Sequence, residues 1–439
     1  SLKYKSFFAG LVDAENFKIN GGQGDDGQVL TSTGSGVAWE AGGGGGVTFK
    51  EEGTNFTNSV MVGEDATGTL SSATGNTALG IDVFAALTSG DNNVAVGFGA
   101  LTANTTGHSN TAVGKSSLVA VTEGFSNTAV GFDAGKAITT GDYNTALGMN
   151  AMNSGTTAAN NTVLGVGSGT SMTDGIGNTL TGMVTSIALT TGDYNVSSGY
   201  ASGYAITTGD ENICIGNSAA LALTTGSKNI AIGSNALNGA TTVGNQTAVG
   251  HLALQSLTSG TANTALGYQA GKATTTGGSC VFIGHNAGLS NTTGARNHCI
   301  GQAAGLSLTT GSDNIFIGEG AGYPGTTGNG NTVVGSLGAR NLTTGHSNTA
   351  MGQNALVAIT EGTENVSMGG SAGASITTGT NNVCLGVRSG LVNQPGGAIT
   401  TGDNQIAIGD SSSANAHIQI DWTVASDKRD KTDVTPLDM

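Results

Sequence analysis

Acidic side chains recur at one position of a repeating pattern and are the first candidates for chemistry. Asp stands six residues before a regularly spaced Gly in five places: Asp91, Asp142, Asp193, Asp210 and Asp403. A stripe of carboxylates could bind Ca²⁺, which takes oxygen ligands. Nine-residue calcium repeats, however, carry an Asp in every unit, and here only some units have one. The pattern therefore favours turn residues that accept backbone hydrogen bonds and keep the protein soluble.

Histidine and cysteine occupy other positions of the same pattern. His251 and His285 each follow one of the regularly spaced glycines, and no H-x-H pair accompanies them, so no metal site is expected. Cys214, Cys299 and Cys384 share one small-residue position five units apart, which is too far for a disulfide. We expect these thiols to fill space where other units have Ala. The sequence predicts no cofactor.

The composition excludes several classes of protein. Gly accounts for 76 of 439 residues, charged residues for 10% and aromatic residues for 5%, which is unlike a packed enzyme domain. The three Pro residues exclude collagen. A net charge of −15 argues against nucleic acid as a partner. The chain has no apolar run long enough to span a membrane, so membrane insertion is not expected.

A strict period of 17 residues dominates the chain. Gly recurs at every seventeenth position from Gly63 to Gly386, and once more at Gly409 after an insertion of six residues. We call these the anchor glycines and each 17-residue repeat a coil. Asn stands four residues before the anchor in 17 of 21 coils, followed by a mostly β-branched, a mostly small and an aliphatic residue. This N-T-A-L/I-G pattern is typical of a short strand.

The strict length and the strict columns together predict an all-β fold, a parallel β-solenoid of stacked 17-residue coils. Stacking would place each Asn over the next Asn as a ladder. Gly at the anchor and in the T-T-G turn would permit a positive φ where a Cβ would clash. We expect the β-branched and aliphatic side chains to fill the coil interior. The Ala column would then face outward and pack three chains about a common axis.

The chain divides into four predicted parts. Residues 1–57 are expected to be an attachment or collar module with the five-glycine linker Gly42–Gly46. Residues 58–409 are the repeat shaft, residues 410–425 a neck strand, and residues 426–439 a charged end. The segment GQVLTSTGSGVAW (27–39) resembles segments of phage tail-fibre proteins.

Residues 426–434 (SDKRDKTDV) resemble the start of the intramolecular chaperone domain of phage tail fibres and tailspikes. In that family the domain assembles a trimer and then cleaves itself off. The resemblance implies that Ser426 is the nucleophile and Lys431 its base. Because the chain stops at Met439, we expect a truncated or uncleaved form. Self-cleavage, a single event rather than enzymatic turnover, would require the full domain.

The repeat N-T-A-L-G-Y-Q-A-G (263–271) is similar to head repeats of trimeric autotransporter adhesins, which implies a homotrimeric, left-handed β-roll. The combined expectation is a phage tail-fibre shaft in the virion. Its partners would be tail or baseplate proteins at the N-terminus and a host surface receptor or glycan. The alternatives are a bacterial trimeric surface adhesin and, more weakly, a capsule-degrading tailspike or an ice-binding solenoid with rows of T-T-G threonines.

Overall fold

The computed structural model describes residues 58–63, 70–325, 327–391 and 397–413, together with the backbone of the strands between residues 18 and 57. The chain forms two compact units, an N-terminal unit (Ser1–Ser279) and a C-terminal unit (Cys280–Met439). Strands and turns make up the described residues of both, without a helix. Consequently, the described part of the chain contains no helix that could cross a membrane.

The strands of the N-terminal unit are β1 (Lys18–Ile19), β2 (Gly22–Gln23), β3 (Gln28–Ser32), β4 (Val37–Ala41), β5 (Thr48–Lys50), β6 (Phe56–Thr57), β7 (Val60–Gly63), β8 (Ala73–Thr74), β9 (Thr77–Leu79), β10 (Val94–Val96), β11 (Thr111–Val113), β12 (Thr128–Val130), β13 (Thr145–Leu147), β14 (Thr162–Leu164), β15 (Thr179–Thr181), β16 (Val196–Ser198), β17 (Ile213–Ile215), β18 (Ile230–Ile232), β19 (Thr247–Val249) and β20 (Thr264–Leu266). Those of the C-terminal unit are β21 (Val281–Ile283), β22 (His298–Ile300), β23 (Ile315–Ile317), β24 (Thr332–Val334), β25 (Thr349–Met351), β26 (Val366–Met368), β27 (Val383–Leu385) and β28 (Ile406–Ile408).

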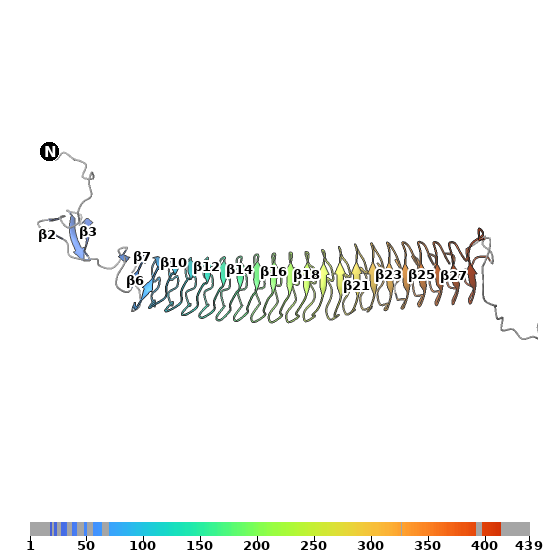
Figure 1. The fold of residues 1–439 in the computed structure, drawn as a ribbon, viewed down its shortest axis with the longest axis horizontal. Helices are drawn as coiled ribbons and strands as arrows, with labels where there is room; N and C mark the ends of the chain where they lie inside the picture. The colour runs from blue at the N-terminus through green and yellow to red at the C-terminus, as the bar shows by residue number, and fades with distance from the viewer. Residues whose placement is uncertain are drawn as a thin grey trace, which may run out of the picture. The chain divides into compact units, whose positions relative to one another are not determined.

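The repeat strands pair in parallel with the next coil in register. Thr111 pairs with Thr128, for example, and Ala112 with Ala129. The coils follow one another in chain order within each unit (Figure 1). Paired strand residues lie 17 positions apart, and 23 positions apart between β27 and β28, where the insertion falls. The parallel β-solenoid predicted from the period is therefore confirmed. Before the repeats, β1 pairs with β2 and β3 with β4, both antiparallel.

The prediction of which side chains fill the coil interior is wrong. Ala95, Ala112 and Ala129 of the small-residue column are fully buried, whereas the flanking β-branched and aliphatic columns, such as Thr111 and Val113, face outward and are half-buried. The Ala column therefore cannot be the surface that packs three chains.

The interior has room only for small strand residues because the other half of the coil already fills it. Around Gly135, a Cβ would lie 2.8 Å from Leu118, 3.0 Å from Ile138 and 3.7 Å from Ala129, so these three side chains converge on one point. The Phe316 coil also has Gly at this position, and a Cβ on Gly322 would lie 2.7 Å from the ring; where the other coil has Ile138, this coil has Gly325. Large and small residues thus alternate across the core.

The two kinds of corner glycine are required for different reasons. The anchor Gly97 has a φ of +129°, and a Cβ there would lie 2.6 Å from the carbonyl oxygen of Gly114, as predicted. Gly192 of a T-T-G turn does not have a positive φ, contrary to the prediction. It is nevertheless restricted to Gly, because a Cβ would lie 2.4 Å from the carbonyl oxygen of Gly209 in the next coil.

Candidate functional site

The residues predicted to carry self-cleavage, Ser426 and Lys431, lie outside the described residues, as does most of the predicted neck strand 410–425. Of the predicted attachment module 1–57, the structure describes backbone strands only. These three predictions stay predictions. Left-handed winding and the homotrimer also stay predictions.

The Asn column forms the buried ladder that the sequence predicts. The backbone N–H and Nδ2 of Asn195 both donate to Oδ1 of Asn178 in the coil before, at 2.9 and 3.1 Å. Nδ2 also donates to the carbonyl oxygen of Gly209 at 2.8 Å. Asn195 is fully buried, so each amide ties the strand of one coil to the turn of its neighbour. This arrangement satisfies polar groups that burial would otherwise leave unpaired.

The Asp column forms a second ladder at the turn. In all five cases Oδ1 accepts a backbone N–H from the preceding coil, at 2.7–2.9 Å: Thr74 to Asp91, Phe125 to Asp142, Ile176 to Asp193, Asp193 to Asp210 and Thr380 to Asp403. The interpretation of Asp as a hydrogen-bonding turn residue is confirmed. Among the described residues, no group of three or more His, Cys, Asp or Glu side chains could hold a metal ion.

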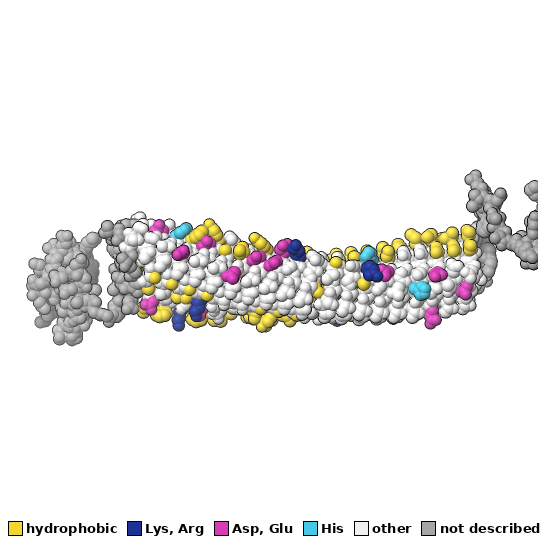
Figure 2. Space-filling model, turned by 90° about the horizontal axis from the view of Figure 1, so that it is seen from below, with side chains coloured by type: hydrophobic (Ala, Val, Ile, Leu, Met, Phe, Trp, Pro, Cys, Tyr) yellow, Lys and Arg dark blue, Asp and Glu magenta, His cyan; other side chains and the backbone are white. Residues whose placement is uncertain are grey.

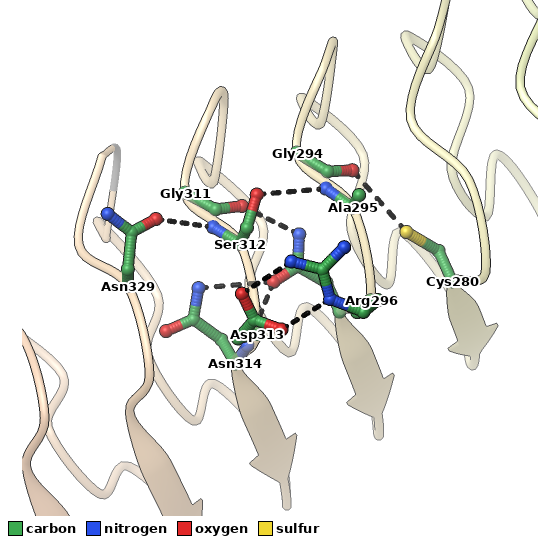
Figure 3. A network of polar contacts seen from close by, with 10 residues as sticks. Cys280, Gly294, Ala295, Arg296, Gly311, Ser312, Asp313, Asn314 and Asn329 are labelled. Carbon is green, nitrogen blue, oxygen red and sulfur yellow. Dashed lines mark hydrogen bonds and ion pairs between the residues drawn. The ribbon is translucent and has the colours of Figure 1, made fainter.

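Other residue types occupy single places of both columns in the first coils of the C-terminal unit (Figure 3), while Asn297 and Asn314 continue the Asn ladder there. The Sγ of Cys280, which stands in the Asn column, donates to the carbonyl oxygen of Gly294 at 3.4 Å. Ser312 replaces Asp, and its Oγ accepts the N–H of Ala295 at 3.1 Å. Beside them Arg296 forms a bidentate ion pair with Asp313, and this pair lowers the pKa of the Asp313 carboxyl. All of these groups serve contacts between coils.

The cysteines are buried thiols and form no disulfide. Burial raises the pKa of the Cys214 thiol to about 12, and it raises the pKa of Cys299 further. Such thiols are protonated at neutral pH and are poor nucleophiles. The prediction that Cys214, Cys299 and Cys384 act as small apolar filler agrees with their complete burial.

The T-T-G threonines use one of their two hydroxyls inside the fold. Thr139 Oγ1 donates to the carbonyl oxygen of Thr156 at 3.0 Å, and Thr207 donates to that of Thr224 at 3.3 Å. The second threonine, such as Thr140, is exposed. A T-T-G row therefore presents an exposed array one threonine wide.

Aromatic rings of neighbouring coils meet at two corners of the coil, and of these rings only His251 was singled out in the sequence. His251 stacks on Tyr268 with the centroids 5.4 Å apart. At the turn before the Asn column, His108 stacks on Phe125 at 4.9 Å, and Phe125 meets the edge of Tyr143 at 5.0 Å. We call His108, Phe125 and Tyr143 the aromatic edge. Its only sequence signal was three aromatic side chains in equivalent turns of successive coils.

The outward columns of the strands carry much of the exposed apolar surface. Leu79, Leu266 and Met351 lie one residue before an anchor and are 44–51% exposed. Figure 2 shows hydrophobic side chains gathered along one edge of the C-terminal unit, and in several places on the N-terminal unit. These columns replace the Ala column as the candidate surface for chain-to-chain packing.

Comparisons with protein-family models, with curated proteins and with solved structures found no match to this chain.

Proposed function

We propose that this chain is the shaft of a homotrimeric phage tail fibre that attaches the virion to a host surface. The observation that carries the proposal is the in-register solenoid with outward apolar columns, taken together with the sequence resemblances at 27–39 and 426–434. The role is mechanical. Laddered coils give a stiff spacer, and weak contacts repeated on three chains add up through multivalency.

The outward strand columns support association with further copies of the chain. The column one residue before the anchor holds large aliphatic side chains at nearly every coil, for example Val130, Leu147 and Ile215, each 38–39% exposed. A contiguous apolar row of this kind is typical of an interaction surface. Because every coil repeats the same columns, an identical chain offers a matching row over the same length.

Light scattering on the purified chain tests the trimer. We expect a mass about three times the chain mass of 42.9 kDa. In the double variant Val130→Asp/Leu147→Asp, two carboxylates would enter the interface, so the mass should fall towards that of one chain. The matched control is Thr140→Asp, which adds a carboxylate on the exposed turn and should leave the mass unchanged. A monomeric unmodified chain contradicts the proposal.

A bacterial trimeric surface adhesin is the second candidate, favoured by the N-T-A-L-G-Y-Q-A-G repeat at 263–271. The codons that follow Met439 in the gene distinguish the two. A helical chaperone domain supports the fibre, whereas a coiled coil followed by a membrane-anchor β-barrel supports the adhesin. If the chaperone domain is present, the intact mass of the expressed full-length product, unmodified against Ser426→Ala, tests self-cleavage before Ser426.

A further inference from the structure

The last strand that the structure describes, β28, leaves one side of its coil exposed. It pairs in parallel with β27. Ile406 and Ile408 are 65% and 64% exposed, whereas the equivalent Val383 and Leu385 of β27 are half-buried. Ala407 is partly exposed as well, although its column is buried in the coils before it. In the described part of the chain, the core of the solenoid is therefore uncovered at β28.

The backbone of β28 carries groups that a further strand would use. The N–H of Val383 in β27 donates to the carbonyl oxygen of Gln405 at 2.8 Å, and the carbonyl oxygen of Leu385 accepts the N–H of the next anchor glycine at 2.7 Å. By the same register, the N–H of Ile406 and the carbonyl oxygen of Ile408 face the place of a next coil. An open strand edge of this kind is a template for pairing with another strand.

The 17-residue period runs on into the residues that follow β28. Seventeen positions after Gly409 comes Ser426, and W-T-V-A (422–425) precedes it. Thr423 and Val424 therefore take the same two strand positions as the Thr-Val pairs of β14 and β24. In both of those strands the Thr is half-buried and the Val is fully buried. The register thus predicts a strand with Val424 inside and Thr423 outside.

Two residues in this stretch fit a final coil better than an internal one. Gln419 stands where the T-T-G turn has its Gly. A Cβ on Gly379 would lie 2.5 Å from the carbonyl oxygen of Gly402 in the next coil, so a coil that carries Gln419 leaves no room for another at this corner. Trp422 stands in the Asn column and cannot continue the amide ladder. Its ring can cover apolar side chains, as the atypical terminal repeats of solenoids do.

We propose that residues 422–425 of the same chain add a closing strand to β28, with Val424 over Ala407 and the ring of Trp422 over the open end of the core. In this register the N–H of Ile406 donates to the carbonyl oxygen of Trp422. The chain's own continuation is the occupant because a tethered segment has a high effective concentration, whereas a second copy must come from solution. The inference goes beyond the proposed function, and it applies to a single chain as well as to a trimer.

Tryptophan fluorescence of the full chain tests the closing strand. The sequence has two Trp residues, so Trp39→Phe leaves Trp422 as the single reporter. We expect a blue-shifted emission and weak quenching by acrylamide, because the ring is covered. Val424→Asp in this background would place a carboxylate against the core, so the strand should detach, the emission shift to the red and the quenching rise. Thr423→Asp is the matched control, since that side chain faces outward and both signals should stay unchanged.

Hydrogen exchange measures the edge itself. The amide of Ile406 should exchange at least about tenfold faster in Val424→Asp than in the unmodified chain, a change of about 1.4 kcal/mol in its opening free energy. Its exchange rate should not change in Thr423→Asp. Native circular dichroism spectra of the variants should superimpose, because the coils before β28 stay folded, and this separates a lost closing strand from lost folding.

Three results would overturn the closing strand. The first is a Trp422 that acrylamide quenches as readily as free tryptophan in the Trp39→Phe chain. The second is an equal effect of Val424→Asp and Thr423→Asp. The third is a protection of Trp422 that disappears on dilution together with a fall in mass by light scattering, which would assign the open end to a second copy. The trimer fails separately, because a monomeric chain with a protected Trp422 keeps the closing strand.

Discussion

Replacing one buried Asn of the ladder should lower the free energy of unfolding far more than replacing an exposed Asn does. Asn195→Ala removes the acceptor of the Asn212 N–H, which Asn195 Oδ1 now holds at 3.0 Å. It also removes the donor to the carbonyl oxygen of Gly209, at 2.8 Å. Both orphaned groups belong to buried residues. At roughly 1–3 kcal/mol for each unsatisfied buried group, the variant should lose about 2–6 kcal/mol.

Urea denaturation measures the loss, and hydrogen exchange locates it. The amide of Asn212 should exchange faster in Asn195→Ala than in the unmodified chain, because its acceptor is gone. Asn217→Ala is the control in the next coil. Its side chain is exposed, so the change should stay within about 0.5 kcal/mol.

Asn195→Gln provides the second control, since Gln already occurs in this column. The Nε2 of Gln246 donates to the carbonyl oxygen of Gly260, and its Oε1 accepts the Asn263 N–H, both at 3.1 Å. The Gln variant should therefore lose less stability than the Ala variant. If Asn195→Ala costs no more than Asn217→Ala, or if Asn195→Gln is equally damaging, the ladder does not stabilise the fold as argued.

Three further predictions concern single positions. Gly369→Ala should lower the free energy of unfolding, measured by urea denaturation, by more than about 2 kcal/mol, because Gly369 has a φ of +130° and a Cβ there would lie 2.6 Å from the backbone of Gly386. Gly370→Ala should be nearly neutral, because a Cβ there would meet nothing within 4 Å; equal effects of the two variants would contradict the steric argument. Asn104 Oδ1 is buried without a hydrogen-bond partner, whereas its Nδ2 donates to the carbonyl oxygen of Gly107, which also accepts from Asn93 Nδ2. Asn104→Leu should therefore stabilise the chain by about 1 kcal/mol in urea denaturation, at a position where neighbouring coils have Leu87 and Val121; a loss of stability would refute this. Arg296 lowers the pKa of the Asp313 carboxyl below its usual 3.8, so the ion pair stabilises the fold above pH 3.8, and this stabilisation is lost as the pH falls through the lowered pKa. Arg296→Ala should therefore raise the Asp313 pKa in an NMR titration, and an unchanged pKa would exclude the ion pair.

Much of the fold could be predicted because a stacked repeat turns sequence columns into spatial columns. A 17-residue period held from Gly63 to Gly386 requires each residue to lie over its equivalent, as Thr111 lies beside Thr128. The Asn ladder and the Asp turn follow from that geometry. A positive φ at the anchor glycines was likewise predictable, because only Gly tolerates it at every coil.

The aromatic edge could not be read from the sequence in the same way. His108 and Phe125 share one position of the turn, but Tyr143 stands one position later. The close approach of Phe125 to Tyr143 depends on how the turn directs each side chain. The register predicts which residues are equivalent, and it does not predict which unlike positions face each other.

The sequence by itself determined the coil length, the parallel register and the ladders, because identical stacked coils leave no other way to pair the buried amides. Only the tertiary structure decided which face of each strand is inside. A strand alternates with a period of two, so the pattern alone is equally compatible with Val113 inside and Ala112 outside, or the reverse. The volume already filled by side chains such as Leu118 and Ile138 from the rest of the coil leaves room for Ala, and the larger aliphatic column is thereby directed outward.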